Sequence, residues 1–147
     1  QPFSTDCIRA QFVLLFAEVF SELINKKSSS ETHGNEETEN DARVFMIEEY
    51  FNEFYMEQVS LKKLSKLLNL SERQTDRMIK KAFGVGFRQQ LCKIRMMNAK
   101  KLLTDSNMEV AKIAEVCGYG SYNGFYLAFK EKTKMTPVQY REAFRNK

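Results

Sequence analysis

A three-residue break between two helical segments constrains the fold of this chain more than any other feature of its sequence. Residues 113–130 read IAEVCGYGSYNGFYLAFK, and the apolar spacing typical of a helix stops at residues 118–120 and resumes at Phe125. A break this short turns the chain sharply, so the second helix crosses the first instead of continuing it. This pattern predicts a helix-turn-helix, whose second helix can be presented to DNA.

The same pattern occurs a second time, about 50 residues earlier, where residues 64–86 align with residues 113–136 if the second turn has one extra residue. The matched pairs are Leu64 with Ile113, Leu67 with Val116, Leu70 with Tyr119, Thr75 with Phe125, Ile79 with Phe129 and Lys80 with Lys130. The apolar pairs predict two similar cores. Both copies also carry polar or aromatic residues on the early turns of the second helix, which core packing does not require.

Cap residues predict where the helices begin and end. Ser60 and Ser71 are typical N-cap residues, Gly84 is a typical residue after a helix end, and Pro137 follows a capping Thr136. Helices are predicted over 42–57, 61–68, 72–83, 87–103, 109–117, 121–133 and 137–145. Because no segment alternates as a strand does, we predict an all-α fold with two helix-turn-helix lobes joined by a long linker helix.

The chain before Asp41, the predicted N-cap of the next helix, has a different character. Residues 8–24 carry apolar residues at helical spacing, so residues 1–24 are predicted to form an amphipathic helix that is either the tail of a sensor region or a homodimer contact. Residues 25–40 are rich in Ser, Thr, Asn and Glu and predict a flexible acidic linker. Residues 41–147 would form the main domain. Since the chain does not begin with Met, we expect it to be part of a longer protein.

Charge is distributed unevenly along the chain. Residues 1–59 contain 4 Lys or Arg and 12 Asp or Glu, whereas residues 60–147 contain 19 Lys or Arg and 7 Asp or Glu. The second part therefore has an excess of +12 within a chain whose net charge is +4. A basic half of this kind favours a polyanionic partner such as nucleic acid.

Several classes of function are disfavoured by the sequence. Cys7, Cys92 and Cys117 are far apart and lie among apolar residues, which is typical of free thiols in a reducing cytoplasm. The single histidine, His33, lies in the predicted linker. We therefore expect no metal, no cofactor and no enzyme activity. The apolar run at residues 12–20 is too short to cross a bilayer, so the protein is predicted to be cytoplasmic.

The C-terminal half resembles the DNA-binding region of AraC/XylS-type bacterial transcriptional regulators over about residues 44–145. The residues that carry the resemblance are Arg95, Ala99, Leu102, Leu103, Ile113, Ala114, Gly118, Tyr119, Phe125, Phe129, Thr136, Pro137 and Tyr140. It implies a double helix-turn-helix that binds promoter DNA, with RNA polymerase as a further partner. The chain departs from the family at Leu127, where Arg is common, at Lys134, where Gly is common, and at Gly86, where Ser or Thr usually caps a helix.

The recognition helices are predicted over residues 71–83 and 121–133. Arg can bond guanine through two hydrogen bonds, Asp can accept from cytosine, Asn can read adenine, and Tyr can touch a thymine methyl or a phosphate. The candidates for base contact are Arg73, Gln74, Asp76, Arg77, Tyr122, Asn123 and Tyr126. An internal Arg–Asp pair on a solvated face is the alternative interpretation of the first group. The candidates for phosphate contact are Ser60, Ser71, Lys80, Lys81, Ser121, Lys130 and Lys132.

These observations predict sequence-specific binding of double-stranded DNA for transcription regulation, with two recognition helices in major-groove segments about 34 Å apart. The loss of arginine at position 127 leaves open whether the second lobe reads bases or only holds the backbone. The alternative function is a helical protein-interaction or dimerisation module that has only non-specific affinity for DNA.

Overall fold

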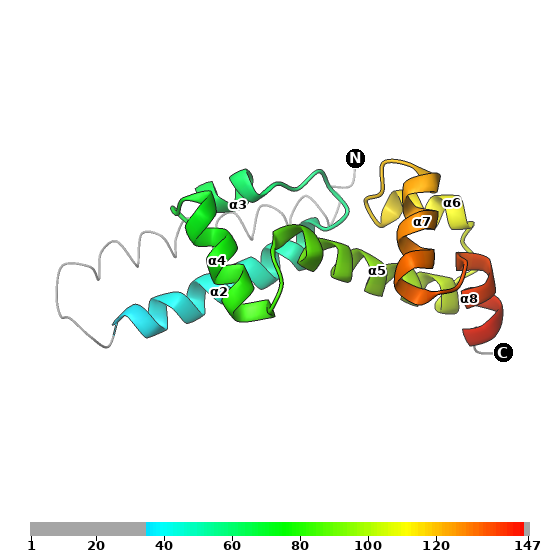
Figure 1. Ribbon diagram of the computed structural model, residues 1–147, viewed down its shortest axis with the longest axis horizontal. Helices are drawn as coiled ribbons and strands as arrows, with labels where there is room; N and C mark the ends of the chain where they lie inside the picture. Colours follow the sequence, from blue (N-terminus) through cyan, green and yellow to red (C-terminus); the bar gives the residue numbers. More distant parts are fainter. Residues whose placement is uncertain (1–34, 146–147) are drawn as a thin grey trace, which may run out of the picture. The chain divides into compact units, whose positions relative to one another are not determined.

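A computed structural model describes residues 35–145, and within this range every regular element is an α-helix (Figure 1). The helices are α2 (Asn35–Phe54), α3 (Leu61–Leu67), α4 (Glu72–Phe83), α5 (Phe87–Asp105), α6 (Val110–Val116), α7 (Tyr122–Thr133) and α8 (Pro137–Phe144). The predicted all-α class and the two helix-turn-helix units, α3–α4 and α6–α7, are confirmed. The predicted helix over residues 8–24 and most of the predicted linker lie outside the described residues.

The chain divides into two compact units, and each contains one helix-turn-helix. Among the described residues the first lobe comprises 35–54 and 59–87, and the second lobe comprises 55–58 and 88–145. The short segment Tyr55–Gln58 therefore belongs to the second lobe although it directly follows α2.

The start of α2 differs from the prediction. The helix begins at Asn35, not at Asp41, so residues 35–40 of the predicted linker are helical. An ion pair of 2.5 Å between Arg43 and Glu39 crosses the predicted boundary at the i,i+4 spacing that stabilises a helix surface. The linker prediction relied on the lack of apolar residues, but polar residues can extend a helix whose later turns are anchored in a core.

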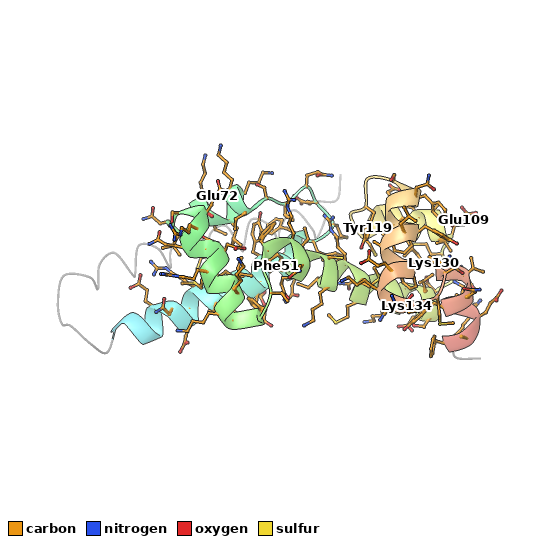
Figure 2. The ribbon with its side chains drawn as sticks, viewed as in Figure 1. Phe51, Glu72, Glu109, Tyr119, Lys130 and Lys134 are labelled. Atoms are coloured by element: carbon orange, nitrogen blue, oxygen red, sulfur yellow. The ribbon has the colours of Figure 1, made fainter. Side chains whose placement is uncertain are left out.

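Phe51 lies at the centre of the core of the first lobe (Figure 2). It is fully buried, and its ring centroid lies 6.5 Å from that of Phe83 and 5.2 Å from that of Phe87. The predicted apolar stripe of α2 is buried at Ile47 and Phe51 and half-buried at Val44 and Phe54. Burying a side chain of this size contributes about 1.5–3 kcal/mol, so α2 is a main source of stability for this lobe.

The core of the second lobe forms where α5, α6 and α7 meet. Its buried members are Met96, Ala99, Leu103, Ile113, Ala114, Cys117, Phe125 and Phe129. The predicted face of the joining helix is thus confirmed at Met96, Ala99 and Leu103, whereas Cys92 is only half-buried. Tyr140 of α8 closes the core by an edge contact with Phe129, with ring centroids 5.4 Å apart.

The two lobes repeat each other in backbone conformation. Asn69 and Gly118 have positive φ angles of 54° and 78° in the turns that follow α3 and α6. Gly84 and Lys134 have positive φ angles of 74° and 62° directly after α4 and α7. The lysine at the second of these positions adopts a left-handed conformation that costs a residue with a Cβ about 1–2 kcal/mol.

Arg95 of α5 holds the segment Tyr55–Gln58 in the second lobe. Its guanidinium donates to the carbonyl of Tyr55 at 2.7 Å and to the carbonyl of Glu57 at 2.9 Å. It also lies 5.8 Å from the ring centroid of Tyr119, within cation–π range. Partial burial lowers the pKa of Arg95 from its ordinary value, but the group keeps its charge at neutral pH.

Gly118 must remain glycine for two reasons. Its φ angle is positive, and backbone carbonyls lie where a Cβ would be. A Cβ at this position would lie 2.6 Å from the Tyr55 carbonyl oxygen and 2.9 Å from the Met56 carbonyl oxygen, whereas a Cβ at Gly84 or Gly120 would meet nothing within 4 Å. We expect Gly118→Ala to destabilise the second lobe by roughly 3 kcal/mol or more, from left-handed strain and backbone overlap together.

The controls separate the two causes. Gly84→Ala keeps the strain without the overlap and should cost about 1–2 kcal/mol in the first lobe, and Gly120→Ala should change stability by less than about 1 kcal/mol. Urea denaturation followed by hydrogen exchange in each lobe measures all three. A loss at Gly118 no larger than that at Gly84 would show that the overlap is relieved by movement of the segment.

Candidate nucleic-acid interface

The first candidate recognition helix, α4, begins in a capping box. Ser71 Oγ accepts from the backbone N–H of Gln74 at 3.3 Å, and Gln74 Oε1 accepts from the backbone N–H of Ser71 at 3.0 Å. Thr75, which is fully buried, donates its hydroxyl to the carbonyl of Ser71 at 3.0 Å. These bonds fix the start of the helix and use the side-chain oxygen of Gln74, which leaves its amide nitrogen as the group able to reach a base.

Arg73 and Arg77 lie on the solvent side of α4, one helical turn apart, and both are exposed. Within the described residues neither guanidinium has an ion pair or hydrogen bond, and the acid of this helix face, Asp76, pairs with a lysine. The internal Arg–Asp pair of the alternative interpretation is therefore wrong, whereas the face is exposed to solvent as that interpretation also requires. Two exposed cations remain on the early turns of a well-capped helix.

Asp76 is the one first-lobe candidate whose side chain turns inward. Its Oδ1 accepts from the backbone N–H of Phe87 at 3.2 Å, and its Oδ2 lies 2.7 Å from Nζ of Lys80. The ion pair with Lys80 and the bond from Phe87 lower the pKa of Asp76. Base contact by Asp76 stays a prediction, but in this structure both of its oxygens have partners inside the lobe.

The role of Asp76 explains how α5 begins without a capping side chain of its own. Gly86 precedes α5, whereas Thr136 precedes α8 and accepts from the backbone N–H of Gln139 at 3.2 Å. In the first lobe the Asp76 carboxylate from α4 accepts from the first backbone N–H of α5, at Phe87, instead of the third, which is the one that Thr136 binds in α8. The sequence signal was the glycine at a cap position, which implies an acceptor from elsewhere in the fold but does not identify it.

The second candidate recognition helix, α7, is capped by Ser121, whose Oγ accepts from the backbone N–H of Gly124 at 3.1 Å. Tyr122 and Asn123 are exposed on its first turn, and Tyr126 is half-buried. The rings of Tyr122 and Tyr126 lie next to each other with centroids 6.1 Å apart. The structure therefore brings the two predicted tyrosines together, and Asn123 is exposed on the same turn as Tyr122.

Leu127, which the family resemblance marks only as a lost arginine, is an exposed side chain. Residues 71–87 and 121–137 have the same sequence of buried, half-buried and exposed positions, so the lobes match residue by residue at an offset of 50. Leu127 therefore occupies the position of Arg77, and it is 66% exposed. Asn123 occupies the position of Arg73 in the same way. The repeat was the signal that could have identified this residue.

The candidates for phosphate contact lie on the surface of their own lobes. Lys81, Lys130 and Lys132 are exposed, and Figure 2 labels Lys130 on α7. Lys80 is exposed as well, although its ammonium group is paired with Asp76. The hydroxyls of Ser60, Ser71 and Ser121 serve as helix caps, since each accepts from the third residue of its helix.

Other kinds of site find little support in the part of the chain that the structure describes. No group of three or more His, Cys, Asp or Glu there is arranged to hold a metal ion. Burial raises the pKa of Cys117 to about 11, so this thiol is a poor nucleophile at neutral pH. None of the described helices is both long and apolar enough to cross a membrane. Cys7 and His33 lie outside the described residues.

Comparison with known proteins agrees with this geometry. A helix-turn-helix domain family matches residues 64–143. The chain is similar to an uncharacterized HTH-type transcriptional regulator of Staphylococcus aureus strain MSSA476, with 33% identity over 109 residues that cover 74% of this chain and 15% of that protein. It is also similar to the HTH-type transcriptional activator RhaS of Klebsiella pneumoniae strain 342, with 28% identity over 82% of this chain and 42% of that protein.

Among solved structures, the chain is similar to the C-terminal domain of AraT, a response regulator from Geobacillus stearothermophilus. The TM-score is 0.68 and the identity 31%, over 71% of this chain and 88% of that one. The chain thus spans less than half the length of these two curated relatives but most of the AraT C-terminal domain.

The inward position of Asp76 leads to a stability prediction. Asp76→Ala should destabilise the first lobe by about 0.5–2 kcal/mol, the usual value of a helix cap. Because the pKa of Asp76 is lowered by folding, its contribution is fully present above pH ~4 and is lost as the pH falls through the lower folded pKa. Urea denaturation at pH 7 and pH 3 measures both effects.

A second substitution tests the cause. A Cβ at Gly86 would lie 3.2 Å from Asp76 Oδ1 and 3.3 Å from Lys80 Cε, so Gly86→Ser alone is crowded. In the Asp76→Ala background the carboxylate is gone and the serine can cap α5 as Thr136 caps α8. The double variant should therefore recover most of the lost stability. Additive losses would show that Asp76 stabilises the lobe through Lys80 alone.

Proposed function

The chain belongs to the AraC/XylS-type helix-turn-helix family of DNA-binding transcription regulators, and from this membership we propose that it recognises a specific sequence of double-stranded DNA with two helices. In the proposal, α4 and α7 each enter a major-groove segment of the same duplex. DNA binding and transcription regulation follow from the family. The sequence specificity and the residues that provide it are the proposed part.

The observation that carries the proposal is the pair Arg73 and Arg77 on α4. Both guanidinium groups are exposed on the early turns of a capped helix and have no intramolecular partner among the described residues. Arg bonded through two hydrogen bonds to O6 and N7 is a common way to read guanine in the major groove. Gln74 can add a contact through its amide nitrogen, whereas Asp76 has a positioning role because its oxygens hold α5 and Lys80.

Phosphate contacts would set the position of each helix on the duplex. Lys80, Lys81, Lys130 and Lys132 lie on the later turns of α4 and α7, where they can reach the backbone that flanks the groove. The helix starts at Ser60, Ser71 and Ser121 present backbone N–H groups to phosphate. These contacts supply affinity that depends on salt and carries little sequence information.

In the second lobe Asn123 is proposed to read adenine, and Tyr122 and Tyr126 to contact the edge of the groove. One relative is a transcriptional activator, so we include RNA polymerase as a partner. A homodimer through residues 8–24 and a cytoplasmic location belong to the same proposal.

Selection of bound duplexes from a random-sequence pool with the full chain tests the proposal. Two enriched blocks about one helical turn apart support two reading helices. One block would mean that one lobe holds only the backbone. Retention without enrichment and with a steep salt dependence would contradict specificity, and no retention would favour the helical protein-interaction module.

Arg77→Ala provides the sharpest prediction from this geometry. It should weaken binding to the selected duplex by roughly 1–3 kcal/mol and relax the base preference at one position. Lys81→Ala is the matched control on the same helix, because Lys81 is exposed and Lys80 is tied to Asp76. It should weaken the selected and a scrambled duplex alike and reduce the salt slope by about one. Equal losses on both duplexes for Arg77→Ala would remove its assignment as a base reader.

A further inference from the structure

We propose that Leu127 reads the C5-methyl group of a thymine, so that the second lobe recognises a block of A·T pairs. The inference rests on the proposed function of α7 as a recognition helix. It assigns a specificity-determining role to a residue that the resemblance to the family marks only as a departure.

The first argument is positional. The burial pattern of residues 121–137 repeats that of residues 71–87 at every position, so α4 and α7 present the same faces to solvent in their own lobes. Whatever Arg77 faces in its lobe, Leu127 faces in the other. A helix docked like α4 therefore brings the leucine side chain to the base edges.

The second argument is the chemistry of the surrounding surface. The first two turns of α7 carry no charged residue, and its first charged residue is Lys130. The matching turns of α4 contain Glu72, Arg73, Asp76 and Arg77. An uncharged surface lacks the arginine guanidinium that binds guanine through two hydrogen bonds. An apolar side chain can instead contact the C5-methyl group of thymine, which no other base presents in the major groove.

The third argument is that Leu127 does not belong to the buried core of its own lobe. It is 66% exposed, whereas the apolar residues of α7 that build the core, Phe125 and Phe129, are fully buried. A leucine on the solvated side of a helix buries little of its apolar surface in the core of its own lobe. Contact with a methyl group removes apolar surface of both partners from water, which is favourable.

Asn123 extends the block. It lies one helical turn before Leu127, at the position that matches Arg73, and is exposed. An asparagine amide can bond N6 and N7 of adenine through two hydrogen bonds. Asn123 and Leu127 together fit adjacent A·T pairs, in contrast to the guanines that fit Arg73 and Arg77.

The test uses the full chain and the duplex obtained by selection. Each thymine in the block assigned to α7 is replaced in turn by deoxyuridine, which removes only the C5-methyl group and keeps every hydrogen-bonding atom. At one position the affinity of the wild-type chain should fall by roughly 3- to 10-fold, the factor expected from burying one methyl group. Leu127→Ala should bind the thymine and uracil duplexes equally, since it lacks the contacting side chain.

Two variants serve as controls. Arg77→Ala should weaken binding to the duplex through the block assigned to α4. It should still show the full loss of affinity when thymine is replaced by deoxyuridine in the block assigned to α7. Leu127→Arg, followed by a new selection, should replace the thymine by guanine at the sensitive position, as Arg77 would require. Because Leu127 is exposed, both of its variants should keep the hydrogen-exchange protection of the wild-type second lobe, and this is measured beside the affinities.

The outcomes are distinguishable. No uracil-sensitive position, or a uracil effect that persists in Leu127→Ala, overturns the inference, and persistence would assign the methyl contact to Tyr122 or Tyr126. If the guanine-containing block is still selected and still depends on Arg77, the proposed function is retained although the inference about Leu127 fails. No enriched sequence of any kind would overturn both.

Discussion

A sharp turn between two helices that pack against each other is the constraint on which each lobe depends. It requires a residue with positive φ, and the two lobes meet the requirement with Asn69 and Gly118. Asparagine tolerates this conformation where space is open. In the second lobe Gly118 packs against the carbonyls of Tyr55 and Met56, so only glycine fits. The turn makes α4 cross α3 and α7 cross α6, and this crossing leaves one face of α4 and α7 outside their cores (Figure 1).

The same frame is filled with different side chains in the two lobes. Thr75 and Phe125 occupy matching positions and are both fully buried, although phenylalanine is much larger. The first lobe gathers its aromatic rings around Phe51 of α2, whereas in the second lobe Phe125 and Phe129 of α7 are the central rings. Each core must be filled to close packing, but the side chains that fill it can come from different helices in the two lobes. The inner positions thus keep their burial while their identities change.

Local rules explain which parts of the fold were predictable from the sequence. Caps and helix ends at Ser71, Gly84 and Thr136 were predicted because each depends on residues within one turn. The start of α2 was not, since it depends on a helix surface pair and an anchored core. The bond from Phe87 to Asp76 joins residues 11 apart through a turn, and no periodicity reports it. The family resemblance marks Leu127 only as a lost arginine, whereas the repeat shows that its position is equivalent to that of Arg77.

The unequal outer faces have a consequence for how such a protein can be oriented on DNA. Helix-turn-helix dimers repeat one surface by two-fold symmetry and therefore match palindromic sites. Here two matching helices lie in one chain, and one carries Arg73 and Arg77 where the other carries Asn123 and Leu127. Under the proposed assignments, α4 binds a guanine-containing block and α7 binds an A·T block. If the chain bound the site in the reverse direction, both helices would lose their base contacts. The chain would then bind its site in one direction only, and the direction would be set by these two positions, at which the outer faces of α4 and α7 differ.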